Sequence, residues 1–213
     1  MQKTSGLLTV LLCLSTILLV VNANALAVGV KSGDWIEYQV TIIGNVPAQH
    51  NSTWARLEVM QVEGTLVSLK ITSAFEDASP LVESVSIDLA TGNLGDCFII
   101  PANLNVGDSF FDRRQGNLTI TNVQQKTVAE AERTLLSAAT KETLYFWDQK
   151  TGILVEAHTT TSDFSMTTKA TKTNMWQDQT SHLIMYAIAV TAIVILIALT
   201  FLVFRKKNAG ALL

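Results

Sequence analysis

Apolar and polar residues alternate along most of the chain between Trp35 and Thr168. In residues 35–42, for example, Ile36, Tyr38 and Val40 fall on one side of an extended backbone and the polar residues between them fall on the other. A period of two is typical of a β-strand with one buried face. The same alternation recurs in residues 55–59, 67–71, 85–89, 118–120, 144–146, 153–157 and 164–168.

Short turn signals separate these predicted strands. They include Glu63-Gly64-Thr65, Thr161-Ser162-Asp163 and two copies of Asp-x-x-Thr-Gly-x-Leu, at residues 88–94 and 148–154. Such short connections favour antiparallel pairing, because parallel neighbours need a crossover of a dozen residues or more. We therefore predict an all-β domain built as an antiparallel meander with one wet face, either a curved half-barrel or a sandwich.

Residues 126–142 are the ambiguous part of this pattern. Their Ala, Glu, Leu and Lys residues favour a helix, and Val128 and Leu135 would share one helical face. A strand at residues 133–138 is the competing prediction. The sequence alone leaves open an all-β domain or a β domain with one short helix.

The two Asp-x-x-Thr-Gly-x-Leu stretches could be a paired site or two turns. An Asp side chain accepts backbone N–H groups two or three residues later, Thr supplements this weakly, and Gly adopts positive φ without a Cβ clash. We interpret both stretches as structural turns that close hairpins. The residues concerned are Asp88, Thr91, Gly92, Asp148, Thr151 and Gly152.

The two ends of the chain predict its topology. Residues 1–25 combine a short basic start, an apolar run and small residues, as in a secretory signal peptide. Residues 183–204 carry no charge and are long enough for a transmembrane helix. The basic residues Arg205, Lys206 and Lys207 follow as a stop-transfer signal that marks the cytoplasmic side.

This topology divides the chain into five parts. A signal peptide (1–25) precedes an extracytoplasmic β domain (28–172), a juxtamembrane stem (173–182), the transmembrane helix (183–204) and a cytoplasmic tail (205–213). We expect a single-pass protein of the cell membrane with its N-terminus outside and the lipid bilayer as a partner.

Charge and side-chain chemistry narrow the function. The region between the two apolar segments holds eleven Lys and Arg against eighteen Asp and Glu, which argues against nucleic acid. Asn51 and Asn117 begin sequons for N-glycosylation. Cys97 is the one cysteine left after signal cleavage, so no internal disulfide is expected, and we interpret it as a buried apolar residue.

No catalytic motif, metal-ligand spacing or cofactor motif stands out, so no cofactor is predicted, and the question of enzymatic activity stays open but leans toward a protein that is not an enzyme. The large aromatics are expected mainly in the core, although adjacent Tyr145, Phe146 and Trp147 must alternate between faces. These aromatics include Trp35, Trp54 and Tyr38. The leading hypothesis is a non-enzymatic module that binds an extracellular protein or glycan of the envelope. The alternative is a carrier or sensor of an apolar or lipid ligand held by a curved sheet, and a hydrolase comes third.

Three stretches carry a family resemblance: VGVKSGDWIEYQV at residues 28–40, FIIPANLNVGDSF at 98–110 and YFWDQKTGILVEAH at 145–158. Together they resemble uncharacterised archaeal membrane-anchored surface proteins with a signal peptide, a β-rich extracytoplasmic domain and a C-terminal transmembrane helix. The resemblance implies strands rather than a helix at residues 133–138. It implies no activity and no site residues.

Overall fold

The computed structural model describes residues 26–46, 51–75, 79–176, 188 and 190–193. The predicted signal peptide and the stop-transfer residues 205–207 lie outside this range. Of the predicted transmembrane segment, residues 188 and 190–193 are described, and they are helical. Within the described ranges, no helix has the length and apolar character needed to cross a membrane.

The described domain contains eleven strands. They are β1 (Trp35–Gly44), β2 (Ser52–Glu63), β3 (Leu66–Phe75), β4 (Leu81–Asp88), β5 (Ser109–Asp112), β6 (Gly116–Thr119), β7 (Asn122–Val128), β8 (Ala131–Ala139), β9 (Thr143–Asp148), β10 (Leu154–Thr160) and β11 (Phe164–Thr173). The prediction of an all-β domain with antiparallel pairing is therefore confirmed.

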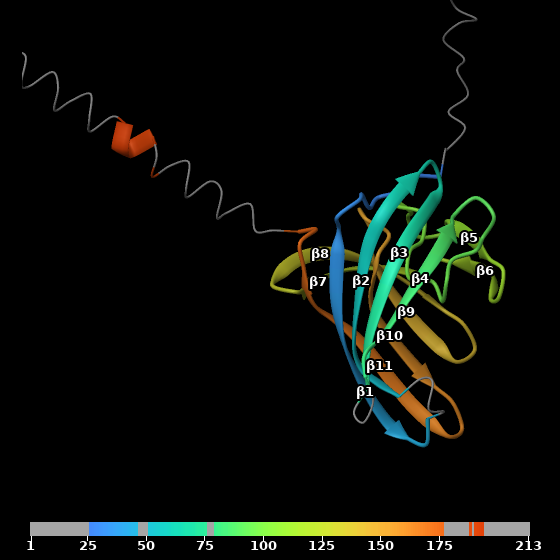
Figure 1. Ribbon diagram of the computed structural model, residues 1–213. Helices are drawn as coiled ribbons and strands as arrows, with labels where there is room; N and C mark the ends of the chain where they lie inside the picture. The colour runs from blue at the N-terminus through green and yellow to red at the C-terminus, as the bar shows by residue number, and fades with distance from the viewer. Residues whose placement is uncertain (1–25, 47–50, 76–78, 177–187, 189, 194–213) are drawn as a thin grey trace, which may run out of the picture.

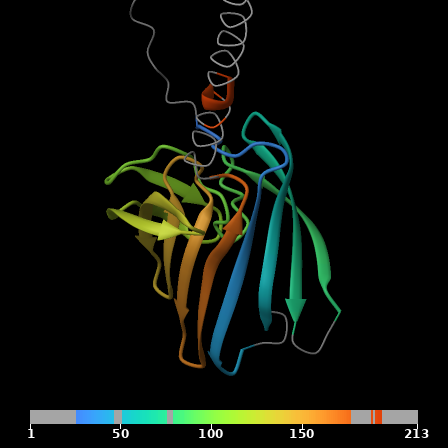
Figure 2. The same ribbon diagram turned by 90° about the vertical axis from the view of Figure 1, so that its left-hand side faces the viewer.

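Nine of these strands form one sheet in the order β4-β3-β2-β1-β11-β10-β9-β8-β7. Two meanders, β1–β4 and β7–β11, are joined where β1 pairs with β11. The sheet curves strongly, and in the described residues its edge strands β4 and β7 do not pair with each other (Figures 1 and 2). The architecture is thus the curved, open half-barrel rather than the sandwich.

Register irregularities accompany the curvature. The pairing shifts between Glu37 and Tyr38 on β1, between Leu154 and Glu156 on β10, and at two places on β2. A bulge bends a strand and increases its local twist. These bulges fall on strands in the middle of the sheet, where bending brings the two meanders to face each other.

Residues 126–142 form strands and no helix. They supply the end of β7, all of β8 and the turn between them, where Ala129 and Glu130 both have positive φ, of 45° and 68°. Positive φ at both central residues is characteristic of a tight two-residue hairpin turn. Pairing of β8 with β7 and β9 supplies ladder hydrogen bonds on both sides, and these outweigh the modest helix propensity of the segment.

Residues 89–121, which include the β5–β6 hairpin, lie against the concave side of the sheet, and we name them the covering segment. Its side chains Leu94, Cys97, Ile99 and Ile100 are fully buried. Trp147 of β9 donates its indole N–H to the carbonyl of Cys97 at 2.7 Å. The main core therefore lies between the covering segment and one end of the concave face.

Candidate ligand cavity

Burial falls along the concave face from one end of each strand to the other. On β1, Ile36 and Tyr38 are fully buried, whereas Val40 is only half-buried. On β3, Val67 and Leu69 are buried, whereas Ile71 is half-buried. We name the part of the concave face under the covering segment the covered end, and the part beyond Tyr38 and Leu69 the open end.

At the open end the described residues leave a cavity of about 480 Å³. Strands β1–β3 form one wall and strands β9–β11 form the other, so the two meanders share the site. Apolar side chains make up much of the lining, among them Val40, Leu57, Ile71, Tyr145, Ala157 and Met166. The volume falls within the range of about 300–1,000 Å³ that is usual for small-molecule sites.

Two tyrosines connect the cavity to the core. Tyr38 donates its hydroxyl to the carbonyl of Leu154 at 2.8 Å, and Tyr145 stacks on Trp147 with ring centroids 5.2 Å apart. Burial raises the pKa of both phenols above the usual value. Both therefore stay neutral near pH 7, and the inner part of the cavity has a rigid, uncharged wall.

The remaining polar lining is of two kinds. Hydroxyl groups come from both meanders, and the hydroxyls of Thr143 and Thr159 lie 3.0 Å apart. Asp96 and Arg114 supply the charged side chains of the lining within the described ranges, and they form an ion pair. No sequence pattern pointed to either residue, since Asp96 sits in an irregular loop and Arg114 in the short connection between β5 and β6.

Cys97 lies behind the cavity without offering a reactive group. Burial, together with the nearby carboxylates of Asp112 and Asp96, raises the pKa of its thiol to about 12. A neutral thiol is a poor nucleophile. The position of Cys97 agrees with its interpretation as a buried apolar residue.

The second of the repeated turns, at residues 148–154, anchors the covering segment. One carboxylate oxygen of Asp148 accepts the backbone N–H of Thr151 at 2.9 Å and its hydroxyl at 2.7 Å, while Arg133 donates to both oxygens at 2.7 and 3.0 Å. Gly152 has a φ of +69°, and its carbonyl accepts the N–H of Ile100 at 2.9 Å. This turn joins β9 to β10 as a hairpin and also docks the covering segment.

The first turn, at residues 88–94, does not lead into a second long strand. Asp88 accepts the hydroxyl of Thr65 at 2.9 Å and the N–H of Ala90 at 3.1 Å, and Gly92 has a φ of +72°. Asp88 pairs with Asn93 in an isolated bridge, and the chain then enters the covering segment. The expected hairpin is here a tight reversal, because residues 94–100 turn inward to fill the core.

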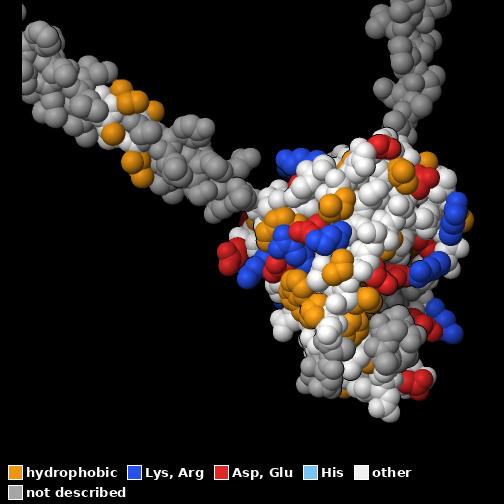
Figure 3. All heavy atoms as spheres, viewed as in Figure 1, with side chains coloured by type: hydrophobic (Ala, Val, Ile, Leu, Met, Phe, Trp, Pro, Cys, Tyr) orange, Lys and Arg blue, Asp and Glu red, His pale blue; other side chains and the backbone are white. Residues whose placement is uncertain are grey.

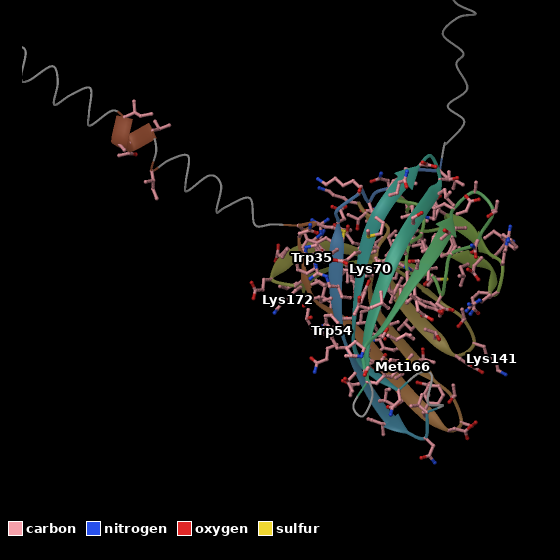
Figure 4. All side chains as sticks on the ribbon, viewed as in Figure 1. Trp35, Trp54, Lys70, Lys141, Met166 and Lys172 are labelled. Carbon is pink, nitrogen blue, oxygen red and sulfur yellow. The ribbon has the colours of Figure 1, made fainter. Side chains whose placement is uncertain are left out.

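The aromatic residues do not all lie in the core. Trp147 is fully buried, but Trp35 and Trp54 are half-buried on the outer face, where Arg56 lies 4.2 Å over the Trp35 ring. Figure 4 labels both tryptophans beside β1 and β2. Charged and apolar side chains are interspersed on this face (Figure 3), and ion pairs link Glu37, Arg56, Glu58 and Lys70.

Phe146 is the member of the Tyr145–Trp147 run that points away from the core. It packs edge-on against His158, which contacts Glu156 through Nε2 at 2.8 Å and Thr167 through Nδ1 at 3.2 Å. A histidine between a carboxylate and a hydroxyl is the arrangement that activates nucleophiles. This group lies on the outer face, whereas the cavity is on the concave face, so the arrangement links β10 to β11 and does not border the cavity.

The two predicted glycosylation sites are accessible. Asn51 precedes β2 and Asn117 lies on β6, and both side chains are exposed. A glycan at either position would extend into solvent without displacing a buried side chain. Glycosylation itself remains a prediction.

Comparison with known proteins gives little further information. No family model matches the chain, and no curated protein sequence matches it. One solved structure that resembles it is the siderocalin Ex-FABP, described as functioning through dual ligand specificities; the alignment covers 76% of this chain and 85% of that one, with 8% identity and a TM-score of 0.26. A TM-score this low supports no inference about fold or ligand, so the candidate site rests on its own geometry.

Proposed function

We propose that this domain is a carrier or sensor that holds a small apolar molecule in the cavity at the open end of its curved sheet. The observation that carries the proposal is the half-covered concave face. The strands continue beyond the covering segment, and where no described residue covers them their inward side chains include the apolar Val40, Ile71 and Met166, with Ser and Thr hydroxyls between them. A sheet that served only as a scaffold would gain stability by filling this space.

Burial of apolar surface favours binding of an apolar ligand in the cavity. Each 100 Å² of apolar surface removed from water contributes about 2.5 kcal/mol. A ligand that contacts both walls covers its own apolar surface together with that of half-buried residues such as Val40, Ile71 and Met166. The fixed shape of the walls, held by the sheet and by the Tyr145–Trp147 stack, reduces the ordering cost of binding.

The location of the domain is part of the proposal. If residues 183–204 span the membrane, the short connection from Trp176 keeps the domain close to the bilayer, where apolar molecules are concentrated. Trp176 is itself 7% exposed and lies under Arg133 at 4.9 Å, and only six residues, 177–182, separate it from the apolar segment in the sequence. A membrane-tethered domain of this kind would accept or present molecules at the membrane surface.

A cavity-filling variant tests the proposal. Ser73→Trp places an indole in the cavity, whereas Thr72→Trp places the same group on the outer face of the same strand. The full chain, held in lipid nanodiscs, would be irradiated with a dodecanol analogue carrying a diazirine, and the cross-linked peptides identified by mass spectrometry. Wild type and Thr72→Trp should be labelled on β1, β10 and β11, and Ser73→Trp at least fivefold less. Equal labelling of both variants would refute the proposal.

A further inference from the structure

The charged groups of the cavity lining are gathered at one place. Asp96 belongs to the covering segment between β4 and β5, and Arg114 belongs to the turn between β5 and β6. Their side chains are paired with each other, and 62% and 67% of their surfaces, respectively, are exposed. The other polar lining groups are uncharged hydroxyls, such as those of Ser52 and Thr159. The cavity thus has uncharged, largely apolar walls and a single charged region.

This ion pair can change partners at little cost. Exposed pairs of this kind contribute little to stability, because water screens them and the long side chains lose freedom when they pair. In the described residues, the guanidinium of Arg114 makes its side-chain hydrogen bond to Asp96. A guanidinium has five N–H donors, so most of its donors remain available to a ligand.

The signs of the two charges define the kind of head group that fits. An anionic head group would pair with Arg114 but would lie beside the carboxylate of Asp96, and a cationic one would meet the reverse arrangement. A zwitterionic head group pairs with both residues and brings no unbalanced charge. The volume of about 480 Å³ accommodates one small molecule, and the walls suit an alkyl chain.

We propose that the ligand is a single-chain amphiphile whose zwitterionic head group binds at Asp96 and Arg114 while its chain lies between the two meanders. The inference rests on the proposed apolar-ligand function and specifies the ligand class. It also assigns a role to the covering segment, which closes one end of the concave face and supplies both head-group contacts.

Competition experiments test the head-group site. The diazirine analogue of dodecanol would be cross-linked to the full chain in nanodiscs, against unlabelled dodecylphosphocholine, dodecanoate, dodecyltrimethylammonium or dodecanol. In wild type, dodecylphosphocholine should compete about fivefold better than dodecanol, since two exposed charge contacts each contribute a few tenths to 1 kcal/mol. Asp96→Asn should shift the preference toward dodecanoate, and Arg114→Gln toward dodecyltrimethylammonium. The control Arg113→Gln removes a neighbouring arginine that does not line the cavity.

The outcomes separate the two proposals. If dodecanol still labels the cavity but the ranking of competitors is the same in wild type, Asp96→Asn and Arg114→Gln, the head-group site is refuted and the apolar-ligand function stands. If dodecanol fails to label the cavity of wild type, both proposals are refuted. A change of ranking in Arg113→Gln as large as in Arg114→Gln would show a general effect of surface charge and would also refute the head-group site.

Discussion

The covered and open ends of the concave face are built from the same strands but differ in how far their side chains are buried. At the covered end, Ile36, Leu69 and Trp147 are sealed beneath the covering segment, and Trp147 also bonds to its backbone. At the open end, inward residues further along the same strands, Val40 and Ile71, border a cavity. Strand pattern alone therefore does not determine burial in an open half-barrel. The length and docking of one irregular segment determine it.

The covering segment is held at defined points, and this explains why it stops where it does. Ile100 donates its backbone N–H to Gly152 in the second repeated turn at 2.9 Å, and Leu89, in the first repeated turn, donates its own to Thr65 at 3.1 Å. Both docking points lie at the same end of the sheet. The repeated turns thus fix the boundary between the core and the cavity.

The largest effect of a substitution on stability is expected at Gly152, where the covering segment approaches the β9–β10 turn most closely. A Cβ at Gly152 would lie 2.0 Å from the carbonyl oxygen of Ile100, and the residue has a φ of +69°. Gly152→Val should therefore lower the free energy of unfolding by about 4 kcal/mol or more. Gly64→Val is the matched control, because Gly64 also has positive φ but nothing lies within 4 Å of its Cβ position.

Chemical denaturation of both variants measures the difference. In Gly64→Val the free energy of unfolding should fall by only about 2 kcal/mol, the cost of holding a valine in a left-handed backbone conformation. Similar losses in the two variants would mean that the approach of Ile100 to Gly152 does not stabilise the covered end.

A pair of truncations compares the two ends directly. Leu94→Ala removes a fully buried side chain of the covering segment and should cost about 3 kcal/mol, including the void that it leaves. Ile71→Ala removes a half-buried side chain that already borders the cavity, and should cost about 1 kcal/mol. Thermal or denaturant unfolding gives both values. A cost for Ile71→Ala as large as that for Leu94→Ala would show that the open end is packed in solution.

The two turn aspartates should also differ. Asp148 is 1% exposed and holds Arg133 as well as Thr151, so Asp148→Ala should cost about 2 kcal/mol, less than a fully buried pair because Arg133 retains some contact with water. Asp88→Ala should cost less, since Asp88 binds Thr65 and Ala90 near the surface. Equal destabilisation in denaturant unfolding would contradict the distinct roles of the two turns.

Much of the fold could be predicted, because the alternation of apolar and polar residues that indicates a strand lies within the strand itself. Alternation between residues 35 and 168 predicts the sheet. The same alternation could also have predicted that Trp35 and Trp54 lie on the outer face. Trp35 is two residues from Glu37, and Trp54 is two residues from Arg56, so each shares the face of a charged residue. The expectation that these tryptophans lie in the core gave residue type too much weight and alternation too little.

The cavity could not be predicted, because it depends on contacts between distant parts of the chain. Its walls face each other only once β1 pairs with β11, whose register joins Ile42 to Met166. Asp96 and Arg114 meet through the path of the covering segment, whose alternation is confined to the short strands β5 and β6. Residues 126–142 stayed ambiguous for a related reason, since their strand state is stabilised by partners elsewhere in the sequence.

The smallest expected effect on stability is that of Glu156 on the outer face. It also tests whether the cavity is independent of the ion pairs on that face. Burial raises the pKa of Glu156, but hydrogen bonds from Lys126 and His158 together lower it by more than burial raises it. The pKa in the folded protein therefore lies below the ordinary value of 4.5. The unfolded chain therefore binds this proton first as the pH falls. The stabilisation by Glu156 is complete above about pH 4.5 and is lost as the pH falls through the lower folded-state pKa.

Unfolding between pH 6 and pH 3, roughly the range over which a carboxylate titrates, tests this contribution in Glu156→Gln, with Glu83→Gln, an exposed carboxylate on β4, as the control. Glu156→Gln should reduce the acid-dependent loss of stability by up to about 1 kcal/mol, and Glu83→Gln should leave it unchanged. Labelling of the cavity by the dodecanol analogue should be the same in wild type and Glu156→Gln, because Glu156 and the cavity-lining Ala157 point to opposite faces of β10. A loss of labelling in Glu156→Gln would show that the outer ion pairs hold the cavity open, and that the boundary between the two ends is not fixed by the covering segment alone.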